Sequence, residues 1–156
     1  MAEAEIDPRT PVLVGVGTSV DDAEAAELMV RATLAAGADA RARDLLAAVQ
    51  RVAVPRGTWS YPDPARIVAD RVGAHGARTV LVDLGIPQQT PSNDAIEAIA
   101  EGRLDVALVV GAESKARAAR AARKSTAANA AGIAQVVGRA PVVGADEIDQ
   151  GDAIPD

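Results

Sequence analysis

The sequence predicts a layered α/β/α domain built on a mostly parallel sheet. Short, β-branched apolar runs alternate along the chain with stretches that have helical spacing, and capping residues or glycines separate them. The composition is globular, with 49% hydrophobic and 24% charged residues. Right-handed crossovers between parallel strands would place helices on both faces of the sheet. A chain of 156 residues is long enough for one such domain.

The first predicted strand is Pro11–Val16, a short apolar run that opens into a loop with Gly17. Asp21 and Asp22 stand where a helix cap and a first-turn acid belong. Gly37 is the predicted stop of the helix that follows. The apolar residues of this helix recur at spacings of three and four: Ala25, Leu28, Met29, Ala32 and Ala36.

The middle of the chain predicts a strand, a helix and a second strand. Arg51–Val54 is a short strand that ends before Pro55 and Gly57. Asp63-Pro64 pairs a capping aspartate with a proline at the first helical position, so we expect a helix from there to Gly73. Thr79–Leu84 is a continuous run typical of a strand that is covered on both faces.

Thr90-Pro91 repeats the pattern of cap and proline, and predicts a helix to Ala100. Its inward-facing residues are expected to be Ala95, Ile96 and Ile99. Leu104–Val110 is the last predicted buried strand.

The last third of the chain changes in character. We expect an alanine-rich helix with basic residues, and then an apolar stretch at Gly132–Val143 that could form a strand or hairpin. The predicted organisation is a domain over residues 1–124 and an Ala/Gly-rich, acidic, partly mobile tail over residues 125–156. The basic residues of the helix are Lys115, Arg117, Arg120, Arg123 and Lys124.

Composition excludes several kinds of site. The chain has no cysteine, so it has no disulfide, thiolate metal site or cysteine nucleophile. His75 is the only histidine, and we expect it in an exposed connection away from any site. Sixteen Lys and Arg against 22 Asp and Glu leave a net charge of −6, which argues against nucleic-acid binding. Phosphate binding by the basic helix stays open as an alternative to a solvated face.

No apolar run is long enough to span a membrane, and the opening residues have no basic segment followed by an apolar block. We therefore expect a cytoplasmic protein. The Gly15-Val16-Gly17 turn lacks the third glycine of a dinucleotide-binding loop, because Val20 stands at that position.

The best candidate site is the loop over residues 85–90. This loop leaves the carboxyl end of a predicted strand and enters a helix N-terminus, where free N–H groups favour an anion or developing negative charge. A polar capping loop without a ligand is the alternative. The candidate ligand-binding residues are Gly85, Gln88 and Gln89, and the candidate catalytic residues are Thr90, Ser92 and Asn93.

The segment GIPQQTPSNDAIEAIAEGRLDVALVVGAES resembles the nucleophile loop, helix and next strand of the thiolase superfamily. RTPVLVGVGTS resembles the first thiolase strand, and VPRGTWSYPDPARIVADRVGA resembles a stretch of the sterol-carrier-type acyl-CoA acetyltransferases. The turn Gly111-Ala112-Glu113-Ser114 is similar to the Gly-Gly-x-Glu-Ser turn of that superfamily. The resemblance covers roughly residues 9–124, and it implies the N-terminal half of a thiolase fold.

The resemblance also implies a reactive cysteine near Gly85, where this chain has no thiol. Thr90 or Ser92 could occupy that pocket, but a hydroxyl needs a general base to act as a nucleophile. The family's histidine and second cysteine lie in a carboxyl-terminal half that has no counterpart here. The active site would therefore be incomplete in this chain alone.

Three interpretations follow. The chain is a thiolase-like acyl-CoA protein, which transfers an acyl group or cleaves a carbon–carbon bond with groups supplied by a missing half or partner. Alternatively, it is a non-catalytic acyl-CoA-binding or interaction domain on that scaffold, or an α/β domain with an architectural likeness only. We expect no tightly bound cofactor, coenzyme A or an acyl-CoA as the ligand, and a homo-oligomer or a heteromer with a second thiolase-like half.

Overall fold

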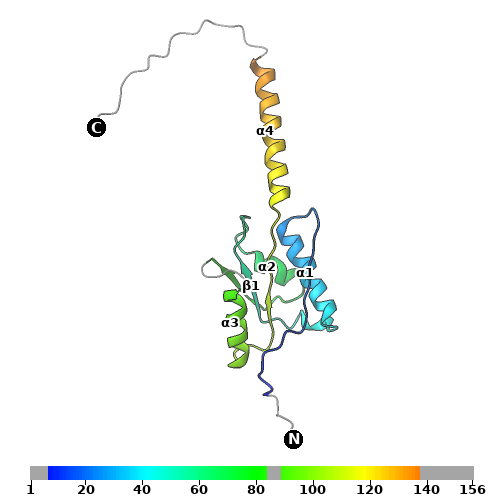
Figure 1. Ribbon diagram of the computed structural model, residues 1–156, viewed down its shortest axis with the longest axis vertical. Coiled ribbons are helices and arrows are strands. Elements are labelled where there is room, and N and C mark those ends of the chain that lie inside the picture. The colour runs from blue at the N-terminus through cyan, green and yellow to red at the C-terminus, as the bar shows by residue number, and fades with distance from the viewer. Residues whose placement is uncertain (1–6, 84–88, 138–156) are drawn as a thin grey trace, which may run out of the picture. The chain divides into compact units, whose positions relative to one another are not determined.

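The computed structural model describes residues 7–83 and 89–137, and the chain divides into two compact units, Met1–Ala118 and Ala119–Asp156. The first unit contains the sheet and the helices that cover it (Figure 1). The elements in chain order are α1 (Ala25–Asp39), a short 3-10 turn (Arg43–Leu45), β1 (Arg51–Pro55), α2 (Pro64–Arg71), β2 (Arg78–Val82), α3 (Gln89–Ala100), β3 (Ala107–Val109) and α4 (Lys115–Val137).

The described residues form a three-stranded sheet in the order β2-β1-β3, with all pairings parallel. Ala53 of β1 lies opposite Val80 of β2 and Val109 of β3, which fixes the register on both sides. β1 is therefore the central strand, and its first four residues are buried. The outer edge of β3 is open among the described residues.

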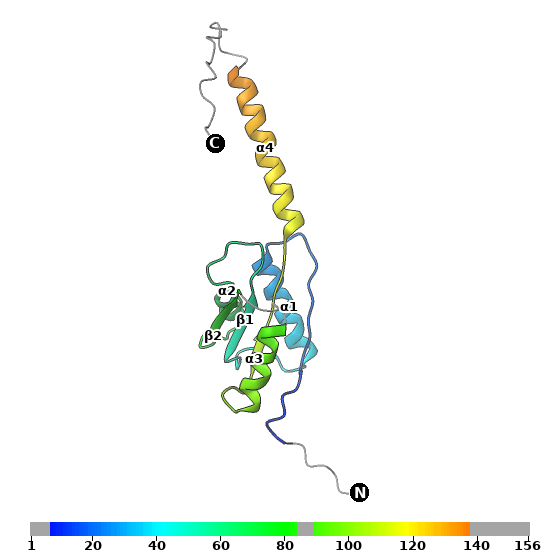
Figure 2. The same ribbon diagram turned by 60° about the vertical axis from the view of Figure 1, so that its left-hand side comes forward.

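The sheet is wound in two directions from β1. The chain moves one way through α2 to β2, and then crosses back over β1 through α3 to β3. Because parallel crossovers are right-handed, this reversal places α2 and α3 on opposite faces. Figure 2 shows α3 in front of the sheet and α2 behind it. The predicted layered α/β/α class with a parallel sheet is confirmed.

The main core lies between β1 and the layer formed by α1 and α2. It is built from small side chains, and its largest fully buried apolar side chain is Met29. Apolar burial of this kind drives the layers together, at roughly 25 cal/mol per Å². The cluster comprises Ala25, Met29, Val30, Val49, Val52, Val54, Ala65, Val68, Ala69, Ala74, Ala77 and Val110.

The predicted start of α2 is confirmed in detail. Asp63 is the N-cap, and one of its carboxylate oxygens accepts a hydrogen bond from the Arg66 backbone N–H at 2.8 Å. The other oxygen accepts from the Thr79 hydroxyl of β2, also at 2.8 Å. Pro64 occupies the first turn, where its missing N–H costs nothing. One side chain thus ends the loop, starts the helix and ties it to the sheet.

The predicted helix end at Gly73 is also confirmed, whereas the predicted stop at Gly37 is wrong because α1 continues to Asp39. Gly73 follows α2 with φ +84°, and Gly102 follows α3 with φ +69°. These left-handed conformations disfavour any side chain with a Cβ, so glycine ends the helices at these points.

The prediction that Pro11–Val16 forms a buried strand is wrong. The segment has no strand assignment, and Val12, Leu13, Val14 and Val16 are all more than half exposed. A strand requires a neighbour to receive its backbone hydrogen bonds, and the described residues provide none beside this segment. Pro11–Val16 is therefore an apolar segment that does not form a fourth strand of the described sheet.

Other boundaries also differ from prediction. Glu24, not Asp21 or Asp22, is the N-cap of α1, and it makes no side-chain capping bond. Thr90 lies inside α3, which begins at Gln89, and Ile96 of that helix is 52% exposed.

Two predictions for the C-terminal part of the described residues, at β3 and α4, are wrong. β3 spans only the three residues Ala107–Val109, so it is shorter than the predicted strand Leu104–Val110. The expected strand or hairpin at Gly132–Val143 is also wrong where it can be compared, since α4 continues as a helix through Val137. Residues 138–143 lie outside the described part, and the predicted division at residue 124 stays a prediction.

We predict that Asp63→Ala lowers the free energy of unfolding by about 1–2 kcal/mol, because it removes both the cap of α2 and the bond to β2. Urea denaturation followed by circular dichroism measures the change. Asp70→Ala is the matched control, since Asp70 lies on the same helix and its ion pairs are longer, at 3.6 Å. Equal losses for the two variants would contradict the capping role.

Candidate functional site

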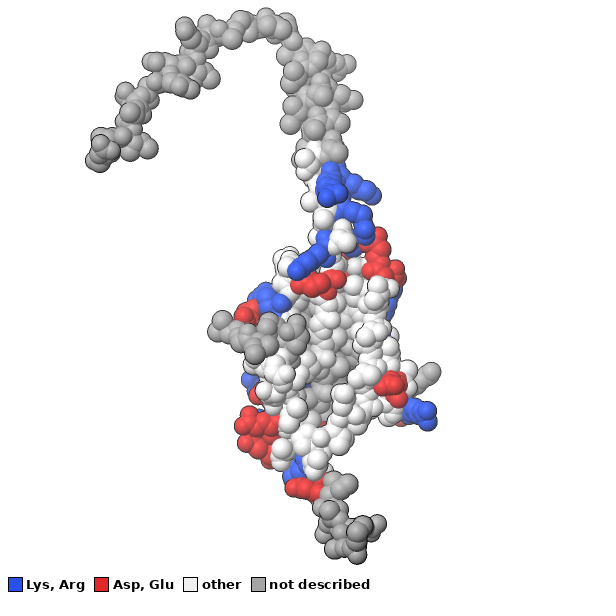
Figure 3. Space-filling view, viewed as in Figure 1, with Lys and Arg blue, Asp and Glu red and all other residues white. Residues whose placement is uncertain are grey.

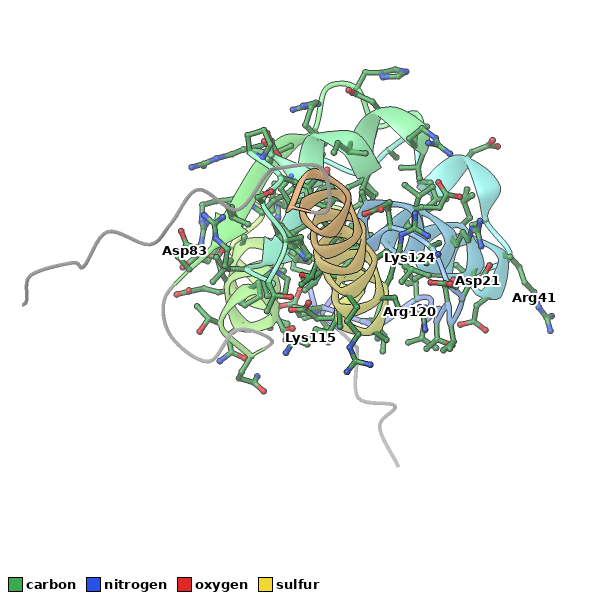
Figure 4. All side chains as sticks on the ribbon, turned by 90° about the horizontal axis from the view of Figure 1, so that it is seen from above. Asp21, Arg41, Asp83, Lys115, Arg120 and Lys124 are labelled. Carbon is green, nitrogen blue, oxygen red and sulfur yellow. The ribbon has the colours of Figure 1, made fainter. Side chains whose placement is uncertain are left out.

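The carboxyl ends of the three parallel strands meet at one edge, which is where α/β sheets usually place their ligands. Arg56 follows β1, Asp83 follows β2, and the turn ending in Glu113 follows β3. Asp83 lies near the outside of the domain in Figure 4. This edge therefore gathers polar side chains from every strand of the described sheet.

Glu113 joins the loop after β1 to the turn after β3. Its carboxylate accepts hydrogen bonds from the Thr58 backbone N–H at 2.9 Å and from the Thr58 hydroxyl at 2.6 Å. The Trp59 indole N–H donates to the Ala112 carbonyl at 3.0 Å. A Cβ on Gly57 would overlap the Trp59 ring, so glycine is needed there. Both carboxylate oxygens of Glu113 therefore already accept hydrogen bonds from Thr58.

Arg56 and Asp83 pair across the same edge. The Arg56 guanidinium donates to both Asp83 carboxylate oxygens, with the longer bond at 3.2 Å. This hydrogen bond lowers the pKa of the Asp83 carboxyl and raises the pKa of Arg56. Both side chains are exposed, so the pair orders the edge more than it stabilises the fold.

A third polar group surrounds Tyr61. The Tyr61 hydroxyl donates to the Glu24 carboxylate at 3.1 Å, and Arg117 donates to the same carboxylate at 2.9 Å. The hydrogen bond from Arg117, with that from Tyr61, lowers the pKa of Glu24. Burial, followed by the bond to Glu24, raises the pKa of Tyr61. The Tyr61 ring also packs against Trp59 with 5.5 Å between centroids.

The predicted site residues divide between surface and interior. Gln89, Thr90 and Asn93 are exposed on the first turns of α3, and the Gln89 amide donates to the Asn93 carbonyl oxygen at 2.6 Å. Ser92 is half-buried and lines a pocket. Gly85 and Gln88 lie outside the described residues. Of the predicted catalytic residues, the structure brings only Ser92 to a cavity.

That cavity is an apolar groove of about 540 Å³, which we call the β3 groove. It lies between the N-terminal segment, α1, α3 and β3, and Figure 3 shows the uncharged, hollowed surface there. No lining residue is ionisable, so the groove itself contains no acid or base. The lining residues are Pro11, Val12, Leu13, Gly15, Val16, Gly17, Ala32, Thr33, Ala36, Ser92, Ala95, Ile96, Ile99, Ala107, Leu108, Val109 and Val110.

Two glycines hold the N-terminal wall of the groove in place. A Cβ on Gly15 would overlap the Ala36 carbonyl of α1, and a Cβ on Gly17 would overlap the Ala32 carbonyl. The Val16 N–H also donates to the Asp39 carboxylate at 2.9 Å. The Gly15-Val16-Gly17 turn is thus a place where backbone packs closely on a helix.

Sequence reasoning missed two features of this region. Glu113 was noted only as part of a familiar turn, and its bonds to Thr58 depend on residues 55 positions apart. Val12 and Leu13 belong to the predicted strand Pro11–Val16, but their exposed side chains line the groove instead. His75 is exposed, as expected.

In the ranges that the structure describes, no three His, Cys, Asp or Glu side chains are grouped to hold a metal ion. None of the described helices combines the length and apolar character that crossing a bilayer requires.

The parallel strand order and the reversal at β1 define a doubly wound α/β domain, and comparison with solved structures shows that it matches part of a thiolase-like structure. The crystal structure of a monomeric SCP2-thiolase like protein type 1 from Mycobacterium smegmatis is similar to this chain at 30% sequence identity and a TM-score of 0.54. The match covers 66% of this chain and 23% of that protein. No family model matches the sequence, and no curated protein does.

We predict that the hydroxyl of Tyr61, the only tyrosine, titrates above its midpoint in the unfolded chain. Because its pKa is raised, Tyr61 contributes stability below the unfolded pKa of about 10, and this contribution is lost as the pH rises through the folded pKa. Absorbance at 295 nm, with and without urea, measures both midpoints. Glu24→Gln should lower the native midpoint, and a native midpoint at or below the unfolded one would refute the burial effect.

We predict that Gly17→Ala detaches the N-terminal segment from α1, because its Cβ has no room beside the helix backbone. Faster hydrogen exchange at Val16, whose N–H is otherwise bonded to Asp39, reports the detachment. Gly76→Ala is the matched control, since no atom lies within 4 Å of its added Cβ. Unchanged exchange in Gly17→Ala would show that the packing is not tight.

Proposed function

We propose that this chain is part of a thiolase-like acyl-CoA protein, of the acetyl-CoA acetyltransferase kind, in which acyl transfer or carbon–carbon cleavage needs a missing half or a partner. The similarity to an SCP2-thiolase like protein is the observation that carries the proposal. The chain spans less than a quarter of that protein, so most of such a molecule would have to come from elsewhere.

The lining of the β3 groove supports the proposal that this chain holds the acyl group and that catalytic groups come from elsewhere. Its lining is apolar apart from the hydroxyls of Ser92 and Thr33, and Thr33 bonds the Met29 carbonyl of its own helix. An apolar pocket of about 540 Å³ is suited to an acyl chain, within the range of roughly 300–1,000 Å³ typical of small-molecule pockets. A hydroxyl nucleophile would need a base, and none lines the groove.

The arginines beside the candidate site are already paired, which leaves the N-terminus of α3 as the place for negative charge. Arg56 and Arg117 are bonded to Asp83 and Glu24, so each cation already has a carboxylate partner. The first N–H groups of α3 remain the place on this chain where negative charge on a thioester oxygen would be stabilised. Thr90 and Asn93 would then border the reacting group, and Ser92 would contact the acyl chain.

The uncharged lining of the groove favours a second candidate, a non-catalytic acyl-CoA-binding or interaction domain on the same scaffold. The two candidates differ in what happens when a second chain is present. A catalytic assembly turns over substrate, whereas a binding domain only retains it.

We expect the untagged chain to bind acetyl-CoA saturably without turning over acetoacetyl-CoA. Calorimetry measures binding, Trp59 emission gives a second signal, and a thiolysis assay measures turnover. Ile96→Asp should weaken binding several-fold because Ile96 lines the apolar groove and a carboxylate there has no counter-ion. Val20→Asp makes a matching change at an exposed apolar residue that is not part of the groove lining, so it serves as the matched control. Absence of binding at millimolar acetyl-CoA would refute the acyl-CoA assignment, and turnover by the chain alone would refute the missing half.

Native mass spectrometry of the protein from its own source tests the dependence on a partner. A second, different chain supports a divided enzyme. A monomer or homodimer favours the non-catalytic candidate.

A further inference from the structure

The open edge of β3 has backbone groups without partners. The Val110 N–H donates to Ala53 and the Val106 carbonyl accepts from Gln50, so these alternate residues face β1. Because a strand alternates with a period of two, the N–H and C=O groups of Ala107 and Val109 face the open edge. No described backbone group bonds to them there.

The opposite wall of the β3 groove is apolar and exposed. Val12 and Leu13 of the N-terminal segment are 71% and 83% exposed, and both line the groove. Natural sheet edges are usually protected by charged residues, prolines or bulges. The three residues of β3 carry no charge, and the groove beside them contains none.

We propose that the β3 groove binds an uncharged, β-branched strand of a second polypeptide, which adds to the open edge of β3 and covers the N-terminal segment. The absence of charge in the groove lining favours an uncharged strand, since a charged strand would lose its hydration against a lining without counter-ions. Main-chain bonds to Ala107 and Val109 would give affinity, and the apolar walls would select the side chains.

The extent of the similar protein supports a second polypeptide as the source of this strand. The match covers 23% of that protein, so in a molecule of that size much more chain is available to continue the sheet. The inference rests on the proposed dependence on a partner. Its test measures strand binding rather than acyl-CoA binding, so the two proposals can fail separately.

The probe is a fluorescent peptide of alternating valine and threonine, with a lysine at each end for solubility, titrated against the full chain by anisotropy. We expect saturable binding together with slower hydrogen exchange at Ala107 and Val109. Leu13→Lys should weaken binding at least tenfold. Val20→Lys is the matched control, because Val20 is 99% exposed on the same segment but does not line the groove.

A second peptide, with proline at its central position, separates strand addition from simple apolar contact. Proline lacks the N–H that a ladder requires, so this peptide should bind at least tenfold more weakly. Equal binding of the two peptides, or equal effects of the two lysine variants, would overturn the proposal. No binding of the valine–threonine peptide would also overturn it, as would a dimer of this chain that Leu13→Lys dissociates, because a second copy would then occupy the groove.

Discussion

Strand β1 is hydrogen-bonded on both sides and covered on both faces, and the positions of the other elements depend on this. Its residues from Arg51 to Val54 are buried, with β2 and β3 in parallel register beside them. The core side chains of α1 and α2 pack on one face, while the Arg51 guanidinium bonds Asp94 of α3. Because β2 and β3 both run parallel to β1, the three carboxyl ends lie at one edge of the sheet, and the polar residues of the candidate site follow them there.

Local sequence signals predicted the parts of the fold that depend on local chemistry. The cap at Asp63, the glycines after α2 and α3, and the β-branched runs of β1 and β2 are each determined within a few residues. The N-terminal segment was mispredicted because strand formation depends on a neighbour, and the pattern of Pro11–Val16 does not show whether one is present. A short apolar run indicates a preference for a sheet, and pairing with a neighbouring strand decides whether a strand forms.

The candidate site likewise has some features that the local sequence predicts and others that depend on which elements pair. The loop before α3 is predicted as the site from its position after a strand, and Ser92, one of the candidate residues beside it, lines the groove. It could not find the contact of Glu113 with Thr58, since those residues come together only when β1 and β3 pair. The groove was hidden for a related reason: its walls come from the N-terminal segment, α1, α3 and β3, and no single stretch of sequence describes it.

The small side chains of the core affect how the protein tolerates substitution. Apart from Met29 and Pro64, the largest fully buried side chains are valines and Thr33, and most of the remaining core is alanine. Each contact contributes little, so the stabilising free energy is divided among many positions of similar weight. Truncating one of these residues removes few atoms and leaves a small void. Enlarging one is the more damaging change, because closely spaced layers have no slack to accept added volume. Variation among relatives should therefore replace valine with alanine in the interior more readily than the reverse, and exclude aromatic residues from the positions that are fully buried.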